Sequence, residues 1–173
     1  MSAALAPLLF EDMVGTWAVM QQMWAAADTD AVTLPAATAR RRLVGGAFVE
    51  ETMELEAGSQ GDAFTRIAYF NFNAVDQRYE YFSLDTRAPQ MMNERSRAGA
   101  AASAGPQPTI ELFGDSFVAP RWGDSTDASF IYRLTVGPIE QNRQVVTLYL
   151  TPRISGTPKE FCAFEYVYTR RST

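Results

Sequence analysis

The sequence contains no histidine at all. Histidine is the commonest general base near neutral pH, and it is also a usual ligand of zinc and of haem iron. Its absence excludes the Ser-His and Cys-His pairs by which many enzymes activate a nucleophile. Zinc and copper would also find few ligands in this chain. We therefore expect no metal, no cofactor and no catalytic residue that the sequence alone identifies.

Cysteine is nearly absent as well, since Cys162 is the only one. An intramolecular disulfide is thus excluded, which suits a reducing compartment. The first residues carry no basic segment, and their apolar run is interrupted by Pro7 and Glu11, unlike a secretory signal. No stretch approaches the ~20 apolar residues of a membrane-spanning helix. We expect a cytoplasmic protein that does not insert into a membrane.

Positive charge is outnumbered, with 15 Lys and Arg against 20 Asp and Glu, a net charge of −5. Binding to nucleic acid needs a clustered basic surface, so we expect no nucleic-acid partner. The 47% of hydrophobic residues is ordinary for a globular protein, and 173 residues suit one domain over 1–173. Arginine far outnumbers lysine and alanine is abundant, which indicates a GC-rich bacterial source.

What the chain does contain is a succession of short segments rich in β-branched and aromatic residues, separated by turn residues. One short helix is expected over residues 7–14, before Gly15, and one flexible Ala-, Gly- and Pro-rich loop over residues 98–108. The strand candidates are Thr16–Ala25, Ala36–Val44, Phe48–Ala57, Ala63–Phe72, Tyr79–Asp85, Met91–Arg97, Thr109–Val118, Ser129–Val136, Gln144–Pro152 and Glu160–Thr169. This spacing predicts an all-β domain.

Several of these segments are apolar on both faces, which favours a barrel over a sandwich. In "FCAFEYVY" (161–168), for example, aromatic side chains occupy both sets of alternating positions. A sheet with one solvated face would show a cleaner alternation of apolar and polar residues. We therefore expect a single closed antiparallel barrel of about ten strands, with a sandwich as the alternative.

Three stretches carry a resemblance to a known family: "LLFEDMVGTW", "ARRRLVGGAFVEE" and "IAYFNFNAVDQRYEYFSLD". With these motifs in this order, the chain resembles a bacterial lipocalin-like family of the calycin superfamily, whose function is not established. The resemblance implies that Gly15 turns the chain into the first strand and that Trp17 plugs the closed end of the barrel. It also implies that an arginine near the end of the last strand, Arg170 or Arg171, stacks on Trp17, a contact worth ~0.5–2 kcal/mol.

Three charged residues interrupt otherwise apolar alternating faces: Glu51, Arg66 and Glu165. Inside a barrel, such charges need partners, because an isolated buried charge is costly. They would then form a structural pair, anchor the polar group of an amphiphilic ligand, or supply a general acid or base. If instead these faces point outward, the charges are simply solvated. With the aromatic residues that would line a cavity, the candidate ligand-binding residues are Glu51, Arg66, Tyr69, Tyr81, Arg97, Tyr132, Tyr149 and Glu165.

The sequence thus favours non-covalent binding of a small, mostly hydrophobic or amphiphilic molecule inside the barrel. One alternative is an enzyme in the same cavity, an isomerase, cyclase or hydrolase that uses Glu51 or Glu165 as its acid or base. The other is an interaction module with a filled barrel that forms a homodimer. Fold alone does not decide among these, because barrels of this kind host many functions.

Overall fold

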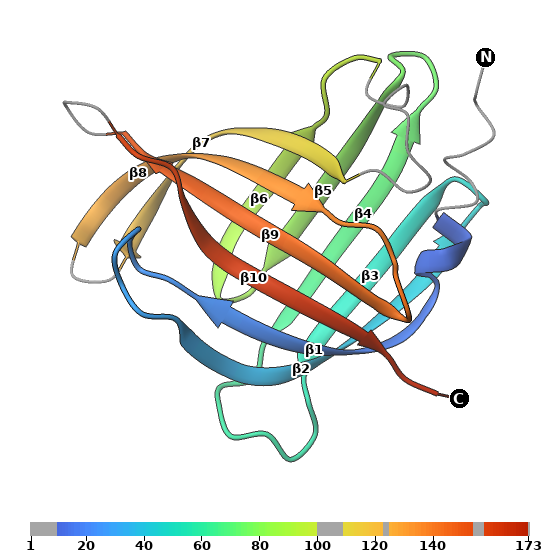
Figure 1. The fold of residues 1–173 in the computed structure, drawn as a ribbon, viewed down its shortest axis with the longest axis horizontal. Coiled ribbons are helices and arrows are strands. Elements are labelled where there is room, and N and C mark those ends of the chain that lie inside the picture. Colours follow the sequence, from blue (N-terminus) through green and yellow to red (C-terminus); the bar gives the residue numbers. More distant parts are fainter. Residues whose placement is uncertain (1–9, 100–108, 123–124, 154–157, 173) are drawn as a thin grey trace.

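The computed structural model describes residues 10–99, 109–122, 125–153 and 158–172. After a short helix over residues 10–13, all regular structure in these described segments is strand (Figure 1). The strands are β1 (Gly15–Met23), β2 (Val32–Val44), β3 (Phe48–Leu55), β4 (Thr65–Asn73), β5 (Arg78–Asp85), β6 (Ala88–Arg95), β7 (Ile110–Trp122), β8 (Ser125–Val136), β9 (Arg143–Pro152) and β10 (Phe161–Arg170).

Each strand pairs antiparallel with the next in the chain, and β1 closes the ring by pairing with β10. The closing pair runs from Trp17 opposite Arg170 to Met23 opposite Phe164. The prediction of one closed antiparallel barrel with a short N-terminal helix is therefore confirmed. Part of the expected helix, residues 7–9, and most of the expected loop, 100–108, lie outside the described residues.

The helix and the C-terminal residues lie at one end of the barrel, which we call the closed end (Figure 1). Phe10 and Met13 of the helix are buried there beside Trp17, which is fully buried. The Trp17 indole Nε1 donates a hydrogen bond to the Met13 carbonyl at 3.0 Å. The helix is thereby fixed across the opening between the strands.

Arg170 completes this closure from the last strand. Its guanidinium carbon lies 4.2 Å from the centroid of the Trp17 ring, and it donates hydrogen bonds to the carbonyls of Asp12 and Val14. Gly15 has a φ of +135°, and a Cβ there would lie 2.8 Å from Arg170 Nη1. Glycine is therefore required both by the backbone conformation and by the close approach of the arginine.

The barrel wall is weakest where β6 meets β7, a place we call the open seam. Within the described residues, the ladder there consists of two pairs, Glu94 with Gly114 and Arg95 with Phe113. Farther along the seam, the Gln90 side chain Nε2 donates to the Val118 carbonyl at 3.0 Å. A side chain thus bridges the two strands where backbone pairing is missing.

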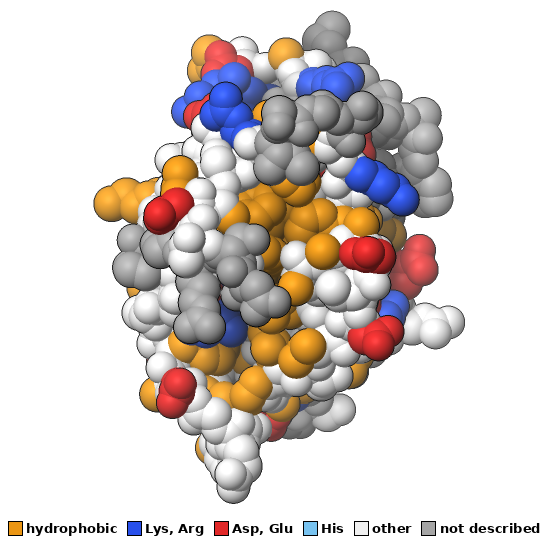
Figure 2. All heavy atoms as spheres, turned by 90° about the vertical axis from the view of Figure 1, so that its left-hand side faces the viewer, with side chains coloured by type: hydrophobic (Ala, Val, Ile, Leu, Met, Phe, Trp, Pro, Cys, Tyr) orange, Lys and Arg blue, Asp and Glu red, His pale blue; other side chains and the backbone are white. Residues whose placement is uncertain are grey.

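The other end of the barrel, where β1 is followed by β2 and where β7 ends and β8 begins, is the open end (Figure 1). A separate apolar cluster gathers toward it, consisting of Ala119, Phe130, Tyr132, Leu150, Phe161 and Ala163, with Met92, Phe117, Trp122, Ala128, Leu148 and Phe164 packed against it. Seen from this side, the molecule has a hollow whose floor is hydrophobic (Figure 2). The interior therefore offers an accessible apolar surface at the open end.

Candidate functional site

A layer of buried charged and polar side chains crosses the middle of the barrel. Arg41 on β2, Glu51 on β3 and Arg66 on β4 all face inward, and each is exposed by 6% or less. The pairing of β2 with β3 places Arg41 directly opposite Glu51. Because successive side chains of a strand point to opposite faces, these three charged side chains all lie in one part of an otherwise apolar interior.

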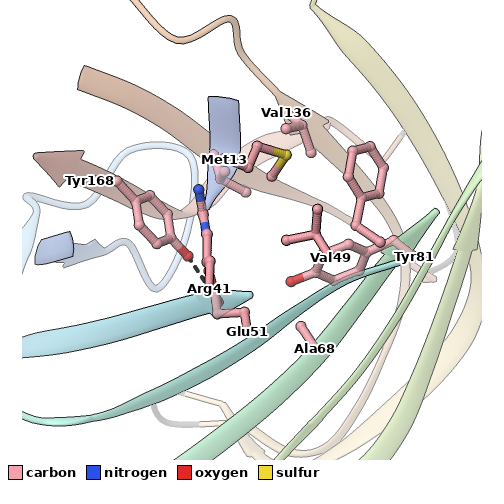
Figure 3. A pocket seen from close by; sticks show the side chains of 10 residues that line it. Met13, Arg41, Val49, Glu51, Ala68, Tyr81, Val136 and Tyr168 are labelled. Carbon is pink, nitrogen blue, oxygen red and sulfur yellow. Dashed lines mark hydrogen bonds and ion pairs between the residues drawn. The ribbon is translucent and has the colours of Figure 1, made fainter. Parts of the chain in front are cut away.

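Glu51 is the centre of this layer. Its Oε2 accepts from Arg41 Nε at 2.7 Å, and its Oε1 accepts from Arg66 Nη1 at 3.0 Å. The Tyr168 hydroxyl also donates to Oε1, at 3.2 Å, and Tyr168, Arg41 and Glu51 converge from three strands (Figure 3). On the far side, Arg41 Nη1 donates to Gln144 Oε1 at 2.6 Å.

The protonation states follow from these contacts. Burial alone would raise the pKa of Glu51, but the charges of Arg41 and Arg66 outweigh it and hold that pKa below its usual value. Burial also opposes the charge of Arg66, yet its neighbours raise the pKa of that guanidinium. The layer therefore contains two cations and one anion, and Glu51 is an ionised structural partner at neutral pH.

Arg66 also reaches toward the next strand. Its Nη2 donates to the Tyr81 hydroxyl on β5 at 2.5 Å, and its guanidinium carbon lies 5.3 Å from the Tyr166 ring centroid. Tyr166 in turn stacks on Phe164, with ring centroids 5.9 Å apart. A continuous path of aromatic rings thus leads from Arg66 to the cluster at the open end.

Glu94 on β6 is the second buried carboxyl group near this layer. It is 2% exposed, and its Oε2 has no hydrogen-bond partner within the described residues. Burial raises its pKa to about 8, although the charge of Arg66 acts in the opposite direction. At pH 7 this carboxyl group is therefore mostly protonated and neutral.

Tyr132 on β8 lies beside Glu94. Its ring occupies the space over Gly114, where a Cβ would lie 2.0 Å from the ring, and its hydroxyl donates to the Asn93 carbonyl at 3.1 Å. Gly114 is also the residue opposite Glu94 in the open seam. The absence of a side chain at position 114 therefore gives the Tyr132 ring its place against the barrel wall.

A second polar group lies nearer the open end. Arg87, in the β5–β6 turn, donates to Asp85 Oδ2 at 2.6 Å and across the interior to Gln21 Oε1 of β1 at 3.2 Å. Its guanidinium carbon lies 3.7 Å from the centroid of the Phe64 ring. Despite its burial, the pKa of Asp85 is lowered by these contacts with Arg87. This pair is balanced in charge and ties two opposite walls together.

The closed half of the barrel is filled. The cavity beside Glu51 has a volume of about 20 Å³ and is lined by Met13, Arg41, Val49, Glu51, Ala68, Phe70, Tyr81, Val136, Val146 and Tyr168 (Figure 3). Such a volume holds about one water molecule. A bound organic molecule would therefore occupy the open half, with the polar layer as its floor.

A shallow groove of about 410 Å³ lies elsewhere, at the wall formed by β3 to β6. Its rim includes the exposed Val44 and Phe48 together with Tyr69, and its lining also reaches Tyr81 and Glu94. Tyr69 projects outward there, and its hydrogen bond with Glu50 raises its pKa. None of the groove's lining residues belongs to the apolar cluster at the open end, and Phe48 on its rim lies on the outer face of β3.

Of the eight residues that the sequence suggests for ligand binding, the structure places Glu51, Arg66, Tyr81 and Tyr132 in the interior. The other four candidate residues do not lie beside these interior residues. Tyr69 and Tyr149 lie on the outer face, Tyr149 under Arg133 with 4.2 Å between guanidinium carbon and ring centroid. Arg97 is exposed, 5.1 Å from the Phe113 ring centroid.

Glu165, which the sequence suggests for ligand binding, does not face the interior. The pairing of β10 with β9 shifts between Cys162 and Phe164, and such a bulge moves the following side chains to the opposite face. Phe164, Tyr166 and Tyr168 therefore face the interior, as their contacts with Trp122, Arg66 and Trp17 show. Glu165 lies on the outer face, opposite Gln22 and Thr147.

Sequence reasoning missed Arg41, Glu94, Gln144 and Tyr168 as members of the interior polar set. Arg41 is the middle of the triplet Arg40 to Arg42, whose alternation on a strand requires one or two members to face inward. Glu94 lies two residues after Met92 and therefore shares a face of the strand with it. The alternation of side chains along a strand could thus have placed Glu94 on an apolar face. The alternating pattern could not place Tyr168 in the interior, because the bulge in β10 interrupts it.

The described part of the chain offers neither a metal site nor a membrane-spanning helix. Within the described residues, no group of three or more Cys, Asp or Glu side chains is arranged to hold a metal ion. In the same part of the chain, no helix is long and apolar enough to cross a membrane.

Comparison with known proteins places the chain in a family. No curated protein matches its sequence. A family of proteins described as "Protein of unknown function (DUF1579)" matches residues 8–170. This match covers nearly the whole chain, including every strand of the barrel, and the chain therefore belongs to the DUF1579 family of proteins of unknown function.

Proposed function

We propose that this chain is a lipocalin-like, bacterial, cytoplasmic protein that binds a small, mostly hydrophobic molecule non-covalently in the open half of its barrel. One observation carries the proposal. An apolar hollow at the open end (Figure 2) lies above a buried polar layer that contains Arg66. Hydrophobic walls with a few convergent polar groups are characteristic of small-molecule sites.

The side chains around the hollow support this proposal. Phe117, Trp122 and Phe164 are only partly buried. Their rings pack edge to face or tilted against Phe130 and one another, with centroids 5.6 to 5.8 Å apart. A ligand that covered these rings would gain about 25 cal/mol for each Å² of apolar surface removed from water.

The enzyme alternative finds less support. Glu51 is held ionised by two arginines, so it is a poor general acid at neutral pH. Glu165 lies outside the barrel, away from the polar layer. We therefore propose no catalysed reaction.

Native mass spectrometry of the freshly purified protein, compared with its denatured mass, is the first test. We expect a small-molecule adduct that is lost on denaturation. A neutral apolar dye such as Nile red then measures access to the barrel in solution. We expect wild-type protein to bind the dye with enhanced fluorescence, in competition with the natural adduct.

Two matched variants locate the bound dye. Phe117→Ala removes a ring at the hollow and should weaken dye binding about 5- to 30-fold, the value of one large apolar contact. Phe48→Ala removes a ring from the outer groove and should leave binding unchanged. Failure of the wild-type protein to bind dye or adduct, or loss of binding in Phe48→Ala alone, would overturn the proposal. A stable dimer with neither ligand would favour an interaction module.

A further inference from the structure

The buried polar layer has unequal charges. Arg41 and Arg66 share a single carboxylate, that of Glu51. The nearby pair of Arg87 and Asp85 is balanced by itself. One guanidinium charge is therefore left over in the interior unless another anion compensates for it, and an uncompensated buried charge is unfavourable.

Glu94 is the one other acidic side chain that the described strands bury next to this layer. It stands directly opposite Tyr81 in the β5–β6 ladder, and the Tyr81 hydroxyl accepts a hydrogen bond from Arg66 at 2.5 Å. Arg66 and Glu94 thus both neighbour Tyr81, and the charge of Arg66 acts on the Glu94 carboxyl group. Glu94 forms no ion pair with either arginine, and its Oε2 is unpartnered within the described residues.

Both groups retain capacity for a further polar partner. A guanidinium has five N–H donors, and in the described structure Arg66 directs two nitrogens to Glu51 and Tyr81. A protonated carboxyl group has one O–H to donate. A small group that accepts from both would therefore satisfy the orphaned Glu94 and compensate for the surplus positive charge.

We propose that the molecule bound in the barrel is an organic anion whose charged group accepts hydrogen bonds from the Arg66 guanidinium and from the protonated carboxyl group of Glu94. This inference rests on the proposed function and specifies its ligand class. A carboxylate has the size and geometry for such contacts, and charge-assisted bonds of the type N⁺–H···O⁻ and O–H···O⁻ are the strong ones. The apolar part of the anion would lie along Tyr166 and Phe164 toward the open end.

Binding of this kind is linked to a proton. Only the protonated form of Glu94 donates to the anion, and ionised Glu94 would repel it. The affinity is then constant at low pH and falls as the pH rises through the pKa of Glu94, which is about 8 in the empty protein. The groups facing Glu94 do not change their charge in this pH range. Arg66 stays charged, and burial raises the pKa values of Tyr81 and Tyr132.

The test compares two probes with the same chain, octanoate and octan-1-ol, by calorimetry and by displacement of Nile red between pH 6.5 and pH 9.5. Octanoate is ionised throughout this range, since carboxyl groups of this kind titrate near pH 4 to 5. We expect octanoate to bind at least tenfold more tightly than octan-1-ol at pH 7. We expect its affinity to fall roughly thirtyfold by pH 9.5.

Two variants test whether Glu94 causes the pH dependence of octanoate binding. Glu94→Gln keeps an amide N–H that donates at every pH, so it should bind octanoate with an affinity that no longer changes with pH. Glu54→Gln alters an exposed glutamate on β3 and should behave as the wild type.

The outcomes separate this inference from the proposed function. Equal affinity for the alcohol and the carboxylate, with Nile red bound, would overturn the anion proposal and leave the binding function standing. A pH-independent affinity of the wild type for octanoate would overturn the role of Glu94. Absence of binding of Nile red and of both probes would refute the proposed function itself.

Discussion

At the scale of single residues, Gly15 shows how one missing side chain decides the closure of the barrel. Replacement by alanine combines an unfavourable φ of +135° with a Cβ that would lie 2.8 Å from Arg170 Nη1. We expect Gly15→Ala to lower the free energy of unfolding by roughly 2–4 kcal/mol, measured by urea denaturation. Gly45→Ala, at a positive φ with nothing within 4 Å, should cost about 1 kcal/mol. Equal losses in the two variants would mean that the Arg170 contact contributes nothing.

Glu51 illustrates the cost of removing one partner from a buried ion group. Glu51→Gln leaves Arg41 and Arg66 without their shared anion, so we expect a loss of roughly 3–5 kcal/mol in urea denaturation at pH 7. Glu54→Gln breaks an exposed pair with Arg40 and should cost less than about 1 kcal/mol. A loss for Glu51→Gln as small as that for Glu54→Gln would show that the buried layer is not held by charge.

The candidate site could be predicted from the sequence only in part. Glu51 and Arg66 could be identified from the sequence because each interrupts a strict apolar alternation. A period of two places both side chains correctly inside the barrel. Glu165 interrupts an equally apolar segment, yet it lies outside. The difference is the bulge between Cys162 and Phe164. This one-residue change of register cannot be predicted from the side chains in this segment.

At the scale of secondary-structure elements, the open seam between β6 and β7 is the most consequential feature. Within the described residues, two ladder pairs join these strands, whereas seven join β8 to β9. Few backbone hydrogen bonds make local opening less costly. We therefore expect backbone amides at the seam to exchange with solvent faster than those of the β8–β9 ladder, by at least tenfold.

Hydrogen-exchange mass spectrometry or NMR measures this difference directly. Gln90→Ala removes the side-chain bond to the Val118 carbonyl and should increase exchange at the seam further, while Gln22→Ala, on the outer face of β1, should not. Uniform protection around the barrel would contradict the expectation.

At the scale of the whole molecule, the sequence predicted the barrel but not the division of its interior. Aromatic residues on both faces of the strands favoured a closed sheet, and the closed sheet is present. The same pattern does not distinguish a filled interior from a hollow one, because apolar side chains line both. The helix with Phe10 and Met13 fills one half. The position of that helix depends on contacts with residues far away in the sequence, since Phe10 packs against Phe70 and Arg170 donates to the carbonyls at the end of the helix.

The dependence of overall stability on pH combines two carboxyl groups with opposite shifts. The lowered pKa of Glu51 adds stability above the unfolded value near 4.5, and that stability is lost as the pH falls through the folded pKa. For Glu94, whose pKa rises to about 8, the unfolded chain ionises first, so stability falls between about pH 4.5 and pH 8 and is level above that. The empty protein should therefore be most stable near pH 5.

Urea denaturation of the ligand-free protein from pH 4 to pH 9 checks this expectation. Wild-type stability should decline by roughly 2–4 kcal/mol between pH 5 and pH 8, and Glu94→Gln, which cannot ionise, should remove most of the decline. Since the two effects are separate, Glu94→Gln should keep the loss at acid pH that Glu51 causes. Parallel curves for the two proteins would mean that Glu94 is ionised in the folded state at neutral pH. In that case the positive charge of the polar layer is already compensated, and an anionic ligand would gain no advantage over a neutral one.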